Sequence, residues 1–91
     1  MGKYTMSREL KIVSLDGTNT LVTTPHIDIA KQKFYEHITT VENTHVFNGT
    51  KTQEEVTKLI DGIKMLCDKD MDFFNTYLCE YGFQEIQKKI W

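Results

Sequence analysis

Cysteine, proline and long apolar runs are scarce in this chain of 91 residues, and each scarcity excludes a class of protein. The two cysteines, Cys67 and Cys79, form no CxxC pair, so we expect reduced, half-buried thiols rather than a disulfide framework or a zinc site. One proline and five glycines leave no linker, and we expect a single domain over residues 1–91. No segment approaches the roughly 18 apolar residues that cross a bilayer. The first residues also lack the apolar run of a signal peptide, so we expect a cytoplasmic protein without membrane contact.

Neither acidic nor basic residues are in large excess. Eleven basic and thirteen acidic residues give a formal net charge of −2, which argues against a polyanion binder and against a DNA mimic. Arg8 is the only arginine and Ala30 the only alanine. This skew toward lysine, with many isoleucines, asparagines, tyrosines and threonines, is typical of AT-rich coding DNA. We interpret the chain as a product of a low-GC bacterium, a phage or another mobile element.

The first quarter of the chain predicts an antiparallel hairpin. Residues 4–15 open with apolar and polar residues in alternation, with Arg8 on the apolar face, and become apolar on both faces at Val13 and Leu15. Residues 16–20 form a turn cluster, in which Gly17 and Asn19 tolerate positive φ, and residues 21–24 return as a second strand. Because the first strand is longer than the second, its N-terminal half must pair with a third strand or with a neighbouring subunit.

The segment that follows predicts a helix and then a short strand. Thr24 is a good N-cap, and Pro25 fits the first helical position. The β-branched run at residues 39–41 is expected to end this helix, and residues 44–47 are a strand candidate closed by a turn. The expected buried stripe of the helix consists of Ile27, Ala30, Phe34 and Ile38.

Three further helical segments are expected in the second half. Thr52 and Glu55 form a capping box that opens a helix over residues 53–67. Asp68 or Asp70 caps an aromatic helix that ends at Gly82, and residues 83–91 repeat apolar residues at helical spacing. The fold class predicted is α+β: a small antiparallel sheet, made of the N-terminal hairpin with or without a short third strand, packed against three to four helices.

Residue types that support metal binding or catalysis occur, but at the wrong spacings. Residues 68–72 imitate the start of a calcium loop, yet Phe73 stands where that loop requires glycine. Cys67 lies at a helix end, where the dipole raises rather than lowers the pKa of a thiol. We predict no enzyme activity and no catalytic, cofactor-binding or metal-binding residue, although the sequence leaves open whether a histidine meets a carboxylate in space. The zinc-binding types that match no ligand spacing are His26, Asp28, His37, His45, Cys67 and Cys79.

Aromatic residues are concentrated in the last nineteen positions, 73–91. They are interpreted either as core side chains in a chain with little alanine or as a contact surface, since Tyr and Trp are enriched at interface anchors. The two interpretations can hold together, with one stripe facing the sheet and another facing a partner. The residues predicted to make contact are Phe74, Tyr77, Tyr81 and Trp91.

The function predicted from these patterns is that of a non-enzymatic, intracellular protein-interaction module, such as a small regulator or inhibitor of a phage or other mobile element. Its partner is expected to be another protein, a second copy of the chain, or both. The alternative is a nucleic-acid-associated regulator, which would bind through a dispersed strip of lysines and lose affinity steeply with salt. The strip consists of Lys31, Lys33, Lys51, Lys58, Lys88 and Lys89.

Overall fold

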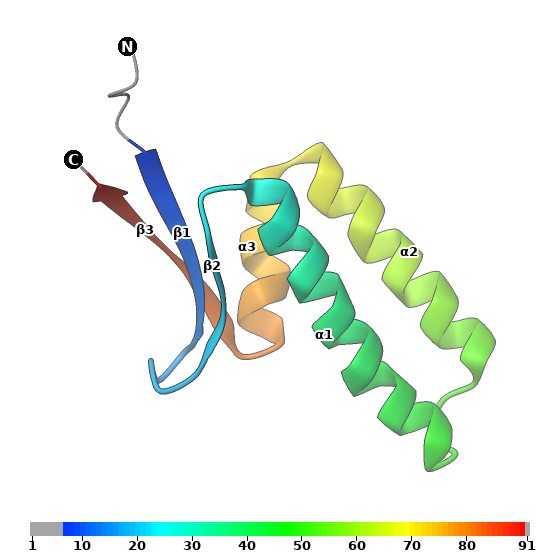
Figure 1. Cartoon of the computed structure of the whole chain (residues 1–91). Helices are drawn as coiled ribbons and strands as arrows, with labels where there is room; N and C mark the ends of the chain where they lie inside the picture. The colour runs from blue at the N-terminus through cyan, green and yellow to red at the C-terminus, as the bar shows by residue number, and fades with distance from the viewer. Residues whose placement is uncertain (1–6, 91) are drawn as a thin grey trace.

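The computed structural model describes the backbone of residues 7–90 and the side chains of residues 9–86. This part of the chain contains three helices and a three-stranded antiparallel sheet, so the predicted α+β class is confirmed. The elements in chain order are β1 (Ser7–Ser14), β2 (Thr20–Thr24), α1 (Ile27–Phe47), α2 (Gln53–Lys69), α3 (Met71–Glu80) and β3 (Phe83–Ile90) (Figure 1).

The sheet has the order β2-β1-β3, with β1 in the middle and both neighbours antiparallel to it. The hairpin is where the sequence predicts it, and Gly17 has the positive φ that its turn requires, whereas Asn19 does not. The third strand is β3, which pairs with β1 over all eight of its residues, from Ser7 opposite Ile90 to Ser14 opposite Phe83. The long edge expected on β1 is therefore covered from within the chain.

Two predicted elements are wrong. The C-terminal segment was expected to be a helix, because apolar residues recur every three or four positions, but it is the strand β3. The strand candidate at residues 44–47 is instead the last turn of α1. In both segments the local pattern fits helix and strand about equally well, so contacts with distant residues decide between them.

Helix α1 continues past its predicted end because its buried face continues through Ile38 and Glu42, and this packing outweighs the low helix propensity of the β-branched run. The hydroxyls of Thr39, Thr40 and Thr44 each donate to the carbonyl oxygen four residues earlier, at 2.8–3.2 Å. The start of the helix is also later than predicted. His26 is the N-cap residue, Pro25 lies outside, and the hydroxyl oxygen of Thr24 accepts from the backbone N–H of His26 at 3.1 Å.

The boundaries of α2 and α3 agree closely with the sequence. The Thr52 hydroxyl oxygen accepts from the Glu55 N–H at 3.1 Å, and the Glu55 carboxylate accepts from the Thr52 N–H at 3.0 Å, so the predicted capping box is confirmed. Asp70 caps α3 by accepting from the backbone N–H of Asp72 at 2.9 Å. Gly82, with φ of 86°, ends the segment in the left-handed region, as its place after the helix predicts.

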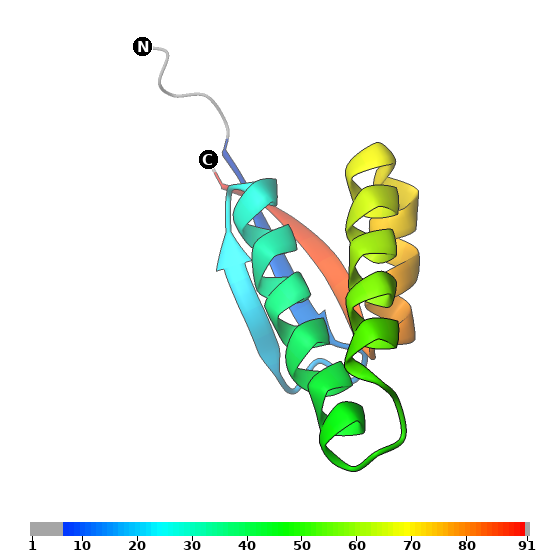
Figure 2. The ribbon, with the colours of Figure 1, turned by 90° about the vertical axis from the view of Figure 1, so that its right-hand side faces the viewer.

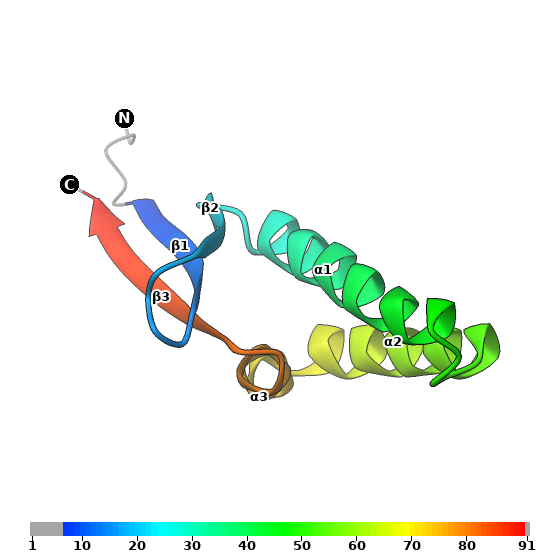
Figure 3. The ribbon, with the colours of Figure 1, turned by 90° about the horizontal axis from the view of Figure 1, so that it is seen from below.

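All three helices lie on the same side of the sheet (Figure 3). Helix α1 packs on β2 and β1, α3 packs on β3, and α2 lies further out, against α1 and α3 (Figure 2). The core sits between these layers. Its fully buried members are Ile12 from the sheet, Phe34, Ile38, Val56 and Cys67 from α1 and α2, and Phe74 and Leu78 from α3.

Candidate interaction surface

The aromatic residues of α3 divide between the core and the surface. Phe34 of α1 is fully buried, and Phe74 and Tyr81 meet it edge-on at ring-centroid distances of 5.6 and 5.9 Å. Phe74 is itself 0% exposed. The prediction that Phe74 offers a contact surface is therefore wrong for this subunit, because the stripe of α3 that carries it faces α1.

The other residues predicted to make contact have different positions. Tyr77 and Tyr81 are half-buried and pack against the edge of the core. Tyr81 is held in place at its hydroxyl, which donates to the Glu42 carboxylate at 2.7 Å. Trp91 lies outside the described residues. Of the three that are described, Tyr77 is thus the half-buried side chain whose hydroxyl makes no hydrogen bond to another described residue.

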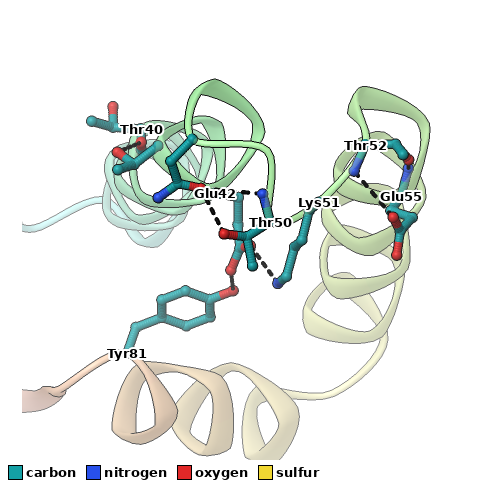
Figure 4. A network of polar contacts seen from close by, with 9 residues as sticks. Thr40, Glu42, Thr50, Lys51, Thr52, Glu55 and Tyr81 are labelled. Carbon is teal, nitrogen blue, oxygen red and sulfur yellow. Dashed lines mark hydrogen bonds and ion pairs between the residues drawn. The ribbon is translucent and has the colours of Figure 1, made fainter.

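A buried polar network fixes the end of α3 to the far half of α1 (Figure 4). Glu42 is only 5% exposed, and its two carboxylate oxygens are both used. One accepts from the Lys51 ammonium at 2.7 Å, and the other accepts from the Tyr81 hydroxyl at 2.7 Å. The sequence analysis missed this network, although Glu42 follows Ile38 by four residues and so continues the buried stripe of α1.

The network changes the ionisation of both buried groups. Burial by itself raises the pKa of the Glu42 carboxyl, but hydrogen bonds from Lys51 and Tyr81 outweigh it and hold the pKa below its ordinary value. Burial, and then the neighbouring Glu42 carboxylate, raise the pKa of the Tyr81 hydroxyl. Glu42 is therefore the acceptor and Tyr81 the donor throughout the neutral range.

An apolar row runs along the seam between α2 and α3. Helix α2 faces α1 on one side, where the Lys64 ammonium lies 5.6 Å from the centroid of the Tyr35 ring. The opposite border of the buried stripe carries Leu59 and Leu66, both half-buried, and α2 also packs against α3. Helix α3 adds two residues that are four positions apart, Phe73 and Tyr77. We name these four residues the α2–α3 seam: Leu59, Leu66, Phe73 and Tyr77.

The seam is open to solvent. The Phe73 side chain is 40% exposed, a large fraction for a ring of its size. Gly62 lies on the same side of α2 as Leu59 and Leu66, and a Cβ atom built on it meets no atom within 4 Å. The surface of α2 therefore carries no side chain at this point.

The lysine strip of the alternative function is largely neutralised. Four of its six members form ion pairs, with nitrogen–oxygen distances from 2.7 to 3.8 Å, and the side chains of Lys88 and Lys89 lie outside the described part. Acidic partners beside these lysines reduce the positive field that would attract phosphates. The four pairs are Lys31–Asp68, Lys33–Glu36, Lys51–Glu42 and Lys58–Glu54.

The histidines and cysteines do not meet. Over residues 9–86, no three side chains among His, Cys, Asp and Glu come together as metal ligands would. His37 and His45 are eight residues apart on α1, about 12 Å along its axis. His37 stacks edge-on against Phe83, with ring centroids 4.9 Å apart. Cys67 is buried, which raises the pKa of its thiol, whereas Cys79 is exposed rather than half-buried as predicted.

The described helices include none that is both long and apolar enough to cross a membrane. Comparisons of the chain with protein-family models, with curated proteins and with solved structures gave no significant match. The case for function therefore rests on the surfaces of the molecule itself.

Proposed function

We propose that this domain is a non-enzymatic protein-interaction module that binds another protein chain through the α2–α3 seam, as a small regulator or inhibitor does. The observation that carries the proposal is the apolar row itself, in which Phe73 is 40% exposed and the other three residues are half-buried, since exposed apolar side chains are common anchors of protein contacts.

Acidic residues predominate on the α3 side of the seam, whereas α2 carries both acidic and basic residues. Residues 70–86, which include α3 and the start of β3, contain four acidic residues and no lysine, arginine or histidine. The acids among them are Asp70, Asp72, Glu80 and Glu85. The partner that suits this surface has an apolar ridge bordered by basic residues, because complementary rims favour encounter and orientation.

The test is affinity capture from cells of the source organism with immobilised domain variants, followed by binding measured with the purified partner. We expect Leu66→Glu and Phe73→Ser to reduce partner affinity at least tenfold, because each removes apolar contact area from the seam. Thermal unfolding of each variant separates a contact effect from a folding defect.

The matched control is Phe47→Ser. Phe47 is 93% exposed at the end of α1, away from the seam, so its replacement should leave the partner's affinity unchanged. A partner retained equally by all variants would show that the seam is not its binding surface. Binding to duplex DNA in place of a protein would favour the nucleic-acid alternative.

A further inference from the structure

Strand β3 has an open edge. It pairs with β1 on one side, and no described residue pairs with it on the other. The N–H of Leu15 donates to the Gly82 carbonyl oxygen at 3.0 Å, and these two residues are opposite each other in the β1–β3 register. Because antiparallel strands alternate bonded and non-bonded pairs, the even-numbered residues of β3 bond to β1. The odd-numbered residues direct their backbone groups outward, as an eight-residue template for another strand.

Charges along this strand are unbalanced within one subunit. Glu85 lies opposite Ile12, and its Oε2 atom is buried without a hydrogen bond from any described residue. Further along, Lys89 occupies the register position opposite Arg8. Glu85 and Lys89 are four positions apart, so the backbone groups of both belong to the outward-bonding set of the strand.

Antiparallel pairing of β3 with itself can bring Glu85 opposite Lys89 of a second copy. Around a two-fold axis, outward-bonding residues must oppose outward-bonding residues, so the allowed registers move in steps of two. The register centred on Gln87 places Glu85 opposite Lys89 of the second copy, twice per pair. The next allowed register toward the start of the strand places Glu85 opposite Gln87, and the one after it places Glu85 opposite Glu85 of the second copy.

We propose that the chain forms a homodimer through the β3 edge, in the register centred on Gln87, which makes one continuous six-stranded sheet. Each Glu85 then lies opposite a lysine of the neighbouring strand. This surface is separate from the α2–α3 seam, so the dimer and the proposed protein partner can be tested independently.

Light scattering of the full chain at high micromolar concentration tests the dimer. The wild type is expected at twice the chain mass of 10.7 kDa. Glu85→Lys and Lys89→Glu each set like charges opposite in both rows, so each variant alone is expected to raise the dimer dissociation constant at least tenfold. Lys58→Glu, at a remote exposed position of α2, is the matched control and should remain a dimer.

Two combinations of these substitutions test the register of the β3–β3 pairing directly. The double variant Glu85→Lys/Lys89→Glu restores opposite charges and should recover the dimer. An equimolar mixture of the two single variants should form a heterodimer, because both rows then join a lysine to a glutamate. Circular dichroism confirms that each variant is folded. A monomeric wild type, or single variants that dimerise as well as the wild type, would overturn the proposal, as would a mixture that fails to associate.

Discussion

At the scale of single residues, the structure separates rings that look alike in the sequence. Phe34 and Phe74 are completely buried and meet edge to face, whereas Phe47 is almost completely exposed. All three lie on helices, and two of them on the same helix. Their roles in stability must therefore differ greatly, since burial rather than residue type sets the free energy that a ring contributes.

Replacing Phe34 by alanine should lower the free energy of unfolding by about 3–5 kcal/mol, because the change leaves a cavity among packed rings. Phe47→Ala, on the same helix, should change it by no more than about 0.5 kcal/mol. Urea denaturation followed by circular dichroism measures both. Equal losses in the two variants would contradict the packing described here.

At the scale of elements, patterns within a few residues proved reliable and patterns that need a distant partner did not. The capping box of α2, the Asp70 cap of α3 and the turn at Gly82 were all predictable, since each consists of neighbouring residues. Strand β3 was not predictable, because apolar residues three or four apart also suit a helix. Its pairing with β1, some seventy residues earlier, decides its conformation.

Two glycines provide opposite tests of this local structure. Gly82 has φ of 86°, so Gly82→Ala should lower the free energy of unfolding by about 1–2 kcal/mol although the site has space for a methyl group. Gly62 is inside α2 with ordinary backbone angles and open space, so Gly62→Ala should raise it by about 0.5–1 kcal/mol. Chemical denaturation of both variants measures these changes in the free energy of unfolding. Changes of the same sign in the two variants would contradict the backbone conformations described for Gly82 and Gly62.

At the scale of the whole molecule, the Glu42 network joins segments that the sheet does not hold together. The far half of α1, the loop before α2 and the end of α3 meet at one buried carboxylate (Figure 4). Because the pKa of Glu42 is held below its ordinary value of 4.5, folding is favoured when the carboxyl is ionised. Its contribution is complete above that value and is lost as the pH falls through the lowered pKa.

We therefore expect acid to destabilise the wild type more than Glu42→Gln. At neutral pH the variant should be less stable by about 1–2 kcal/mol, since an amide cannot replace the charge-assisted bond from Lys51. The difference should shrink as the pH falls below 4.5, because the wild-type carboxyl is then protonated as well.

Urea denaturation at a series of pH values measures this difference. Asp16 also has a lowered pKa, of about 2, owing first to the hydrogen bond from the Ser14 hydroxyl, but it is present in both proteins and cancels in the comparison. Glu54→Gln removes an exposed ion pair on α2 and serves as the control, with an expected change of about 0.5 kcal/mol or less. A constant difference across the acid range would exclude the ionised network as its cause.

The sequence by itself determined the α+β class, the N-terminal hairpin, and the ends of α2 and α3, because caps, turns and strand alternation depend on residues close together in the chain. Only the tertiary structure decided that residues 83–90 form a strand, that α1 extends to Phe47, and that Phe74 is core rather than surface. Those outcomes depend on contacts across long separations, such as the bond between Glu42 and Tyr81. Such contacts leave no periodic pattern in the sequence of either segment, because each contact forms only when two segments far apart in the chain are folded against each other.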